Sequence, residues 1–485
     1  MEKGKQFEQH TKQGAPSCLT KALIAVAIEF NMETSRLAFC TRDSYNKGRL
    51  RINGKTWSTV DNCQTISAPI TVIIKPDGKT LHGYGYEAEV LYDELKLENK
   101  HKQYYFFKDI SLKLMKLFKE TNDVHLIDEN RKTLPALTVF TLVIKFFKTA
   151  IHRLCQLCDE QDKYYVIIVP EIFQEIGAID FMRNAALEAG INVKQLAVVT
   201  EIDAVSLFHQ KETHNKKSST GKKFMIVNAG SYYTTFVVHE STDFGIVKES
   251  TAVEIKKGGG KMLKKAFKKF CIELFGKDGY KTFKSQSKQE WSEFESDFLK
   301  KTFFFDPFTS TFVRMSLPSI LHQKCKDMLS NKFSSRNKPK TFEGISVSSN
   351  KVCFPAELMQ TTIDPSVQRV IFYINRTMSN LADVDTVIVF GEFAKLPMLK
   401  NGVKKTFFSK NVVFYGEDTE AALKGAVIIG LGFGQIEKID RVHDSAVVAA
   451  IDFGTTFSGW AYSLRANFDA DRTKAFTKLW KSGSI

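Results

Sequence analysis

A strand–loop–strand pattern near the C-terminus constrains the fold of this chain more than any other stretch. Residues Val447–Tyr462 contain an apolar run, an aspartate, a Gly-Thr-Thr turn and a second apolar run. This order predicts a buried strand, a tight loop and a returning strand. Gly454 lets backbone amides approach an anion, and the hydroxyls of Thr455 and Thr456 can donate to phosphate oxygens. Asp452 at the strand end can hold a hydrated Mg²⁺, so the stretch predicts half of a phosphate site.

An altered form of the same pattern lies near the N-terminus, between Ala25 and Phe39. Four of its residues match the C-terminal stretch at one constant offset of 423 positions, and Glu29 stands opposite Asp452. The matching pairs are Ile28 with Ile451, Phe30 with Phe453, Ser35 with Ser458 and Ala38 with Ala461. An internal repeat of this kind predicts one complete copy of a unit followed by the start of another.

The C-terminal stretch resembles the first phosphate loop of the actin-like ATPases, specifically of the heat-shock 70 family in its divergent 12A/12B branch. Further segments resemble that family in the same order. They are a buried strand with Val-Pro and a helix (164–189), a second phosphate loop (224–239), the adenosine-contacting turn (387–397) and a closing helix (421–427). The resemblance runs from about Leu23 to Gly434 and implies an α/β, actin-like ATPase (ribonuclease H-like) fold with two lobes around a nucleotide cleft. The family's peptide-binding β-sandwich and lid are not visible in the sequence.

The element pattern and the resemblance together predict five parts. They are a disordered lead-in at 1–20, a first lobe at 21–222, a second lobe at 223–437, a linker at 438–445, and the start of a truncated second copy at 446–485. Helical periodicity is expected over Tyr104–Phe118 and over Phe173–Ala189.

Composition excludes several classes of protein. The net charge of +15 invites a nucleic-acid function, but no reader motif accompanies it, so a solvated basic surface is favoured. Cys155 and Cys158 have zinc-knuckle spacing without a second pair, and the eight cysteines are expected to be thiols in a reducing compartment. No apolar run approaches the roughly 20 residues that a membrane span needs, so the default location is cytoplasmic.

The first loop of the complete copy lacks groups that the resemblance assigns to phosphate and metal. Glu29, Asn31 and Met32 stand where the family has Asp, Gly and Thr, and all three are candidate nucleotide contacts. Glu29 keeps a charge and is a candidate metal ligand, but Asn31 is less free than glycine and Met32 has no hydroxyl. Glu33 adds negative charge beside the expected polyphosphate, at a cost on the order of 1 kcal/mol.

The second loop departs further from the family. Asn228, the other candidate metal ligand, replaces an Asp, and Thr235 replaces another. Gly230 and Ser231 are candidate nucleotide contacts, although Ser231 and Tyr232 stand where the family has glycines. A tyrosine side chain at the place of phosphate oxygens is a steric block unless the loop moves.

Three other segments complete the predicted site. Gly258 and Gly259 open a lysine-rich helix that could attract an anion, although a surface helix start is the commoner meaning. In the adenosine turn Gly391 is kept, and Glu392 replaces the second glycine. Glu201 is the candidate catalytic carboxylate. The family's catalytic lysine aligns best with Ser111, and Lys108 and Lys113 lie close by in the sequence.

These substitutions predict a heat-shock-70-like (12A/12B-type) protein with a degenerate ATP site, a pseudo-ATPase that acts as a chaperone-like or scaffold binding protein. Hydrolysis needs metal-bound phosphates, an oriented water and charge neutralisation, and nearly every group in these roles is changed. One alternative is a functional chaperone-like ATPase that holds ATP or ADP with Mg²⁺, and another is a basic surface that binds polyanions. We expect protein partners or clients, whose identity stays open, rather than nucleic acid or a membrane.

The intact loop at Asp452, Gly454, Thr455 and Thr456 forms only half a site. One explanation is that the chain is a fragment of a longer tandem protein. The other is that this hairpin replaces the Leu23–Phe39 hairpin in the sheet of the first copy, which would return good phosphate donors to the cleft.

Overall fold

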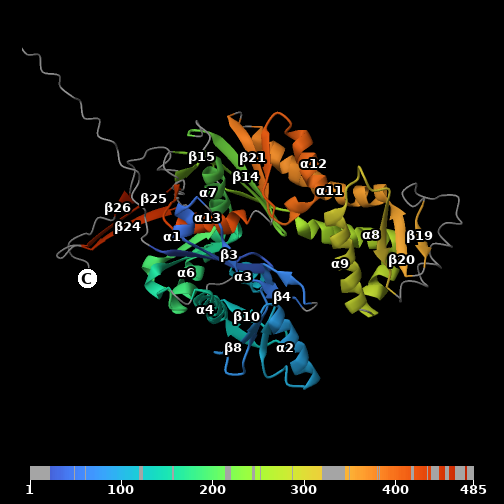
Figure 1. Ribbon diagram of the computed structural model, residues 1–485, viewed down its shortest axis with the longest axis horizontal. Helices are drawn as coiled ribbons and strands as arrows, with labels where there is room; N and C mark the ends of the chain where they lie inside the picture. Colours follow the sequence, from blue (N-terminus) through green and yellow to red (C-terminus); the bar gives the residue numbers. More distant parts are fainter. Residues whose placement is uncertain are drawn as a thin grey trace, which may run out of the picture. The chain divides into compact units, whose positions relative to one another are not determined.

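The computed structural model describes residues 22–48, 50–59, 62–118, 124–155, 158–213, 220–242, 246–251, 253–286, 288–318, 344–348, 350–379, 381, 383–416, 420–433, 435–437, 447–453, 458–464 and 476–477. It divides into unit 1, Met1–Glu437, and unit 2, Lys438–Ile485. The helices and strands form a mixed α/β structure with several sheets, as the sequence predicted (Figure 1).

The first large sheet of unit 1 is built around the apolar strand β1 (Ile24–Phe30), whose seven residues are all buried. Its order is β13-β12-β1-β2-β3, and β6 also pairs with β2. The other strands are β2 (Thr34–Thr41), β3 (Asn53–Gly54), β6 (Ala68–Pro69), β12 (Lys163–Val169) and β13 (Leu196–Thr200). β1 pairs parallel with β12 and antiparallel with β2, which explains its continuous apolar sequence: a central strand is covered on both faces.

The second large sheet repeats this plan around β14 (Lys223–Ala229). β14 pairs antiparallel with β15 and parallel with β21. The full order is β22-β21-β14-β15-β16-β23, and β17 also pairs with β15. The partner strands are β15 (Tyr233–Ser241), β16 (Ile246–Glu249), β17 (Glu254–Lys257), β21 (Val384–Phe390), β22 (Asn411–Phe414) and β23 (Gln435–Glu437). Each sheet therefore presents a strand–loop–strand hairpin next to a parallel strand.

Two helices pack between these sheets. α7 (Glu201–Thr213) and α13 (Ala421–Gly430) share a buried cluster with β1, β12, β14 and β21. The two helices cross at Gly425, where an added Cβ would overlap the carbonyl group of Ala204. The close crossing needs glycine because any side chain would separate the helices.

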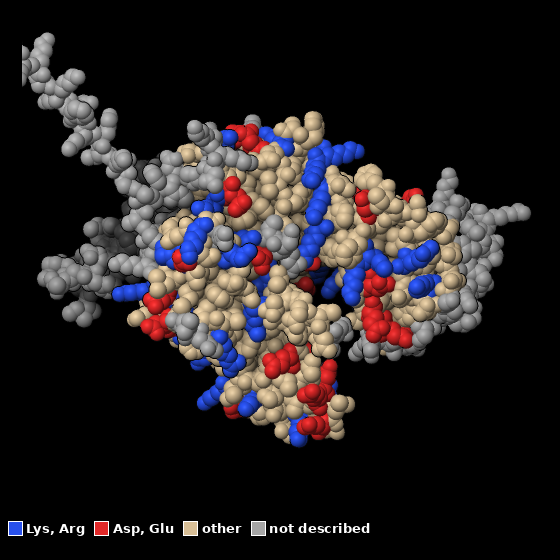
Figure 2. Space-filling view, in the orientation of Figure 1, with Lys and Arg blue, Asp and Glu red and all other residues tan. Residues whose placement is uncertain are grey.

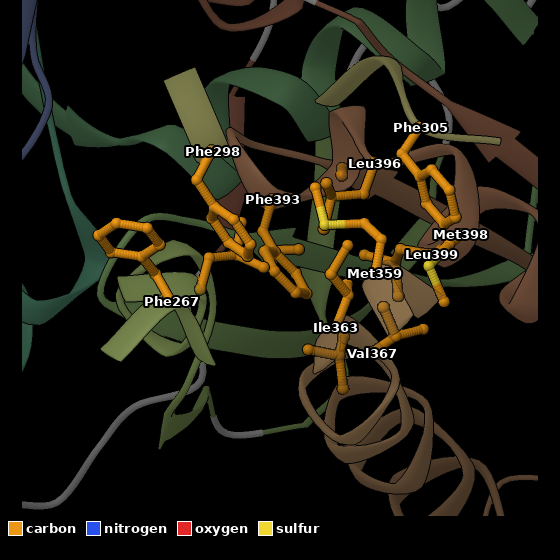
Figure 3. Close-up of a cluster of buried hydrophobic side chains, with 14 of the residues drawn as sticks. Phe267, Phe298, Phe305, Met359, Ile363, Val367, Phe393, Leu396, Met398 and Leu399 are labelled. Carbon is orange, nitrogen blue, oxygen red and sulfur yellow. The ribbon is translucent and has the colours of Figure 1, made fainter. Parts of the chain in front are cut away.

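A second cluster covers the other face of the first sheet. It is formed with α4 (Ala136–Leu154) and α6 (Ala178–Glu188), and includes the phenylalanines Phe30, Phe140 and Phe147. The phenylalanine-rich sequence also supplies a third core, in which side chains of α8, α9, α11 and α12 meet (Figure 3). These helices are α8 (Gly260–Gln286), α9 (Lys288–Phe304), α11 (Ala356–Met378) and α12 (Pro397–Thr406). Phe267, for example, lies 4.9 Å from Phe298 between ring centroids.

Short elements complete unit 1. The remaining helices are α1 (Arg42–Asn46), α2 (Tyr86–Leu97), α3 (Ile110–Phe118), α5 (Glu171–Glu175), η1 (Glu160–Asp162), η2 (Val193–Gln195) and η5 (Phe393–Lys395). The remaining strands are β4 (Trp57–Ser58), β5 (Gln64–Thr65), β7 (Val72–Ile74), β8 (Leu81–Tyr84), β9 (Tyr105–Phe107), β10 (His125–Ile127), β11 (Thr133–Pro135), β18 (Phe312–Ser316), β19 (Ser346–Ser348) and β20 (Lys351–Pro355).

Two helical predictions need correction. The stretch 104–118 is not one helix, because β9 pairs with β7 before α3 begins at Ile110. The stretch 173–189 is interrupted at Gly177, whose φ of 74° ends α5 and precedes α6. In 104–118 the pairing of β9 with β7 overrides the helical periodicity of the sequence. In 173–189 the left-handed backbone of Gly177 interrupts the helix.

Unit 2 contains three described strands, β24 (Val447–Phe453), β25 (Ser458–Leu464) and β26 (Phe476–Thr477), in the order β24-β25-β26. The proposed replacement of the Leu23–Phe39 hairpin is wrong, because β1 itself lies between β12 and β2, whereas β24 pairs with β25 in a separate sheet.

No helix in the described part of the chain combines the length and the apolar character that a bilayer-spanning segment needs.

Candidate functional site

Most of the predicted site residues of the complete copy line one cavity of about 770 Å³ in unit 1. This volume is in the range of small-molecule sites. The predicted residues that line it are Glu29, Asn31, Met32, Glu201, Asn228, Gly230, Ser231, Gly391 and Glu392. Gly258 and Gly259 are not among the lining residues, although Gly260 is. Asp452 lies on β24 of unit 2, and Gly454, Thr455 and Thr456 fall outside the described residues.

Glu29 is neutralised by a partner that the sequence analysis missed. It is the penultimate residue of β1 and is almost fully buried, and Arg36 stands directly opposite on β2. The Arg36 guanidinium donates through both Nε and Nη2, with Nη2 2.8 Å from Glu29 Oε1. A bidentate pair of this kind occupies both carboxylate oxygens. The hairpin register, which places Arg36 across from Glu29, was the signal that could have found it.

The loop after β1 contributes Asn31 and Met32 to the lining of the cavity, and neither side chain carries a hydroxyl group for a phosphate. Met32 is buried in the core beneath the first sheet. The backbone N–H of Asn31 donates to the backbone oxygen of Thr34 at 2.8 Å and closes the turn. The side-chain oxygen Oδ1 of Asn31 has no hydrogen-bond partner among the described residues. In this loop Met32 therefore has no hydroxyl to donate to a phosphate, and the backbone N–H of Asn31 is already bound to Thr34.

The buried carboxylate of Glu171 and the partly exposed carboxylate of Glu201 share one amide in the lining of the cavity. Asn228 Nδ2 donates to Glu171 Oε2 at 3.1 Å and also to Glu201 Oε2. Glu171, which follows Pro170 after β12, also accepts from the Ile202 backbone amide at 2.6 Å. The sequence analysis passed over Glu171, and its place directly after a Val-Pro strand end was the available signal.

The surroundings of this pair favour a proton. Burial raises the pKa of Glu171 to about 7. Burial, and then the neighbouring charges of Glu171 and Glu29, raise the pKa of Glu201 well above its ordinary value. A buried carboxylate beside another carboxylate is costly to ionise, so the pair holds a proton more tightly than a solvated glutamate does.

Tyr232 bridges the two loops. Its hydroxyl donates to Glu33 Oε1 at 3.0 Å, which joins the loop after β14 to the loop after β1. Lys261 Nζ lies 5.3 Å from the centre of the Tyr232 ring, a cation–π contact. Burial, followed by the adjacent Glu33 carboxylate, raises the pKa of Tyr232, so the hydroxyl remains a donor. The tyrosine that was predicted as a steric block therefore also ties the two loops together.

The glycine segment before α8 is packed against the second loop. The Gly260 and Lys261 amides donate to Gly230 O and Ser231 O at 3.2 and 2.6 Å. Gly259 has a φ of +105°, and an added Cβ there would overlap Gly230 O. These amides are consumed inside the protein and are not free to bind an anion.

The turn after β21 keeps one glycine for a steric reason. Gly391 has a φ of +99°, and an added Cβ would lie 2.5 Å from Asn228 Oδ1. Glu392 forms an ion pair with Lys395 at 2.8 Å.

The lysines expected near the catalytic position are engaged elsewhere. Lys108 pairs with Glu89 and Lys113 with Glu129, each at 3.3 Å, and neither lines the cavity. Ser111 is fully buried. Lys116, one helical turn beyond Leu112, does line the cavity, and the sequence analysis did not single it out.

The residues of this cavity do not fit a magnesium-bound triphosphate. The described residues hold no group of three His, Cys, Asp or Glu side chains arranged to bind a metal ion. Both oxygens of Glu29 are occupied by Arg36, and Asn228 presents an amide that is already bound through Nδ2 to two carboxylates in place of a free carboxylate. Mg²⁺ prefers free carboxylate oxygens together with substrate phosphates, and the predicted metal ligand Glu29 has none free.

Comparison with known proteins identifies relatives over most of the length. No protein-family model matches the chain. It is 23% identical to human heat shock 70 kDa protein 12A over 478 residues, which covers 84% of this chain and 69% of the relative. The mouse protein 12A is 24% identical over the same length, and human protein 12B is 22% identical over 497 residues, covering 88% of this chain and 71% of the relative. The chain is a distant relative of heat shock 70 kDa proteins 12A and 12B.

This relationship confirms the resemblance that the phosphate-loop and Val-Pro segments predicted. The matched length exceeds either large sheet, so the similarity to the heat-shock 70 kDa 12A/12B branch does not depend on one motif.

Proposed function

We propose that this heat-shock-70-like chain is a pseudo-ATPase that acts as a binding or scaffold protein through protein partners. In this proposal unit 1 is an actin-like ATPase body, and its two sheets form two lobes whose hairpin loops face the shared cavity. The relationship to heat shock 70 kDa proteins 12A and 12B and the repeated strand–loop–strand plan support this arrangement.

The Tyr232–Glu33 bridge is the observation that carries the proposal. It occupies the space between the two loops, which is where this architecture would place the phosphate chain. A bound triphosphate would have to displace the Tyr232 side chain and separate it from both Glu33 and Lys261.

The charges around the cavity act on a polyphosphate in both directions. Each ionised carboxylate placed about 4 Å from a phosphate oxygen repels it by about 4 kcal/mol at an effective dielectric constant of 20. Glu33, Glu171 and Glu201 all line the cavity, but Glu171 and Glu201 repel a phosphate only once they have lost the proton that their raised pKa values favour. Four lysines, Lys116, Lys261, Lys264 and Lys395, line the same cavity and attract phosphate. The Tyr232–Glu33 bridge, and not the net charge, is therefore what sets this cavity against a polyphosphate.

Isothermal titration with ATP and ADP, with and without Mg²⁺, tests the proposal. We expect a dissociation constant weaker than about 1 mM, no effect of Mg²⁺ and no phosphate release. Micromolar, Mg²⁺-dependent binding together with turnover that is lost in Glu201→Gln would refute it. An exposed-site variant, Glu175→Gln on α5, serves as the matched control because it changes the same chemical group outside the cavity.

A functional ATP-dependent chaperone is the second candidate, and the cavity volume of about 770 Å³ favours it.

Polyanion binding is the third candidate function. Lysine and arginine side chains are spread over the visible face and alternate with acidic groups (Figure 2), which is the pattern of a solvated surface. A complex with an oligonucleotide that weakens steeply with salt would favour polyanion binding.

A further inference from the structure

The three described strands of unit 2 repeat the first three strands of unit 1 in the same hydrogen-bond register. β1 and β2 pair from Ile24 with Thr41 to Phe30 with Ser35. β24 and β25 pair from Val447 with Leu464 to Phe453 with Ser458. Adding 423 to each residue number of the first hairpin gives the paired residue of the second at all seven positions.

The third strand obeys the same offset. β2 pairs with β3 through Ala38 with Gly54 and Phe39 with Asn53. β25 pairs with β26 through Ala461 with Thr477 and Tyr462 with Phe476. The sequence match was confined to the hairpin, so the agreement of the third strand is independent evidence that unit 2 is built as a copy of β1-β2-β3.

β1 and β24 differ in what pairs with the edge opposite to the hairpin partner, which is β2 for β1 and β25 for β24. In unit 1 the parallel strand β12, with the sequence KYYVIIV, pairs with that edge of β1. The pairing runs from Ile24 opposite Lys163 to Glu29 opposite Ile168. Helix α13 also packs on β1, and Gly430 lies so close to Ala25 that an added Cβ would be 2.7 Å from the Ala25 Cβ. Within the described residues of unit 2, β24 has a ladder partner only in β25.

The sequence of β24 is that of a strand covered on both sides. Six of the seven residues in Val447–Phe453 (VVAAIDF) are apolar, as expected for a central strand beside a parallel neighbour. A three-stranded sheet with such a strand at its edge leaves backbone donors and acceptors unpaired and invites another strand. A repeat unit of this kind cannot bury its apolar faces without the remainder of its copy.

We infer that the edge of β24 that has no ladder partner among the described residues is a docking edge for a parallel, apolar strand, and that the occupant is the β12 counterpart of a second α/β body in the same polypeptide. The order of elements in unit 1 supports one polypeptide as the source, because there the three-stranded element precedes its own parallel strand and covering helix. The docking edge is independent of nucleotide binding in the cavity of unit 1.

The first test is hydrogen exchange with mass spectrometry on the purified 485-residue chain. We expect the β24 amides that point away from β25 to exchange at least tenfold faster than their counterparts in β1. The internal control is β1, whose amides are bonded on both edges. Equal protection of β24 and β1 in a monomeric sample would overturn the inference, because the edge would already have a partner.

The second test identifies the occupant in the native protein. An antibody against unit 1 isolates the endogenous polypeptide for mass measurement and peptide mapping. We expect a polypeptide well above the 55.0 kDa of this sequence, with peptides that repeat the β12 segment after the β26 segment. A 55.0 kDa polypeptide, whether alone or with a separate protein on β24, would refute the assignment to one polypeptide.

Discussion

Replacing Glu171 with glutamine should remove the part of the pH dependence of stability that this carboxyl group imposes. Glu171 has a pKa of about 7 in the folded protein, against an ordinary value of 4.5, chiefly because it is buried. That difference corresponds to about 3 kcal/mol. Glutamine keeps an oxygen to accept from the Ile202 amide and removes the charge.

The sign follows from proton binding. A carboxyl with a raised folded-state pKa binds more protons when folded, so its contribution to stability falls as pH rises through the window from about 4.5 to 7. At pH 5 the wild type and Glu171→Gln should have similar unfolding free energies. At pH 8.5 the variant should be more stable by up to about 3 kcal/mol, because it has no charge to bury at that position.

Urea unfolding followed by circular dichroism at half-unit pH steps measures the effect. Glu201 remains in the variant, and its own burial leaves part of the slope, since the two carboxylates titrate as a pair. Glu175→Gln, at an exposed position of the same helix, should follow the wild-type curve. Parallel curves for wild type and Glu171→Gln between pH 5 and 8.5 would refute a buried, proton-holding pair.

Three further predictions follow from single contacts. Arg36→Met should lower the unfolding free energy by about 3–5 kcal/mol because it leaves the Glu29 charge buried without a partner, whereas the Arg36→Met, Glu29→Gln double variant should recover most of it in urea unfolding. A loss under 1 kcal/mol in the single variant would contradict a buried pair. Gly425→Ala should lower the thermal midpoint strongly because its Cβ overlaps the facing helix, while Gly54→Ala, whose Cβ would meet only a carbonyl oxygen at 3.4 Å, should change it little. Equal shifts would argue against the close crossing. Tyr232→Phe should cost about 1 kcal/mol by removing the hydrogen bond to Glu33 and should still show no ATP binding by calorimetry, since the ring and the carboxylates remain. Micromolar binding in this variant would show that the hydroxyl alone closes the site.

Some errors of the sequence analysis show where local pattern loses to tertiary contact. Residues 104–118 have helical periodicity, but Tyr105–Phe107 pair with β7 and only the later part is helical. The C-terminal hairpin resembles β1-β2 closely enough to suggest a replacement, yet β1 keeps its own place between β12 and β2. Similar strands compete for one position, and sequence similarity does not decide which of them fills it.

The sequence by itself determined the local units and the relationship to the heat-shock 70 branch. Largely apolar runs such as Ile24–Phe30 and Lys163–Val169 specify strands because burial on both faces needs a mostly apolar sequence. The expectation of altered phosphate loops, as at Met32 and Tyr232, likewise came from residue type, because the chemistry of a phosphate loop is local.

Only the tertiary structure decided which groups meet. The Tyr232 hydroxyl finds Glu33 from 199 positions away, and Asn228 joins Glu171, 57 positions away, to Glu201. Such contacts depend on how two separate sheets place their loops around one cavity. A periodic pattern along the chain does not predict which distant residues come together in this way. The proton-holding character of the base arises in the same way, since burial and neighbouring charge set a pKa and both belong to the folded protein.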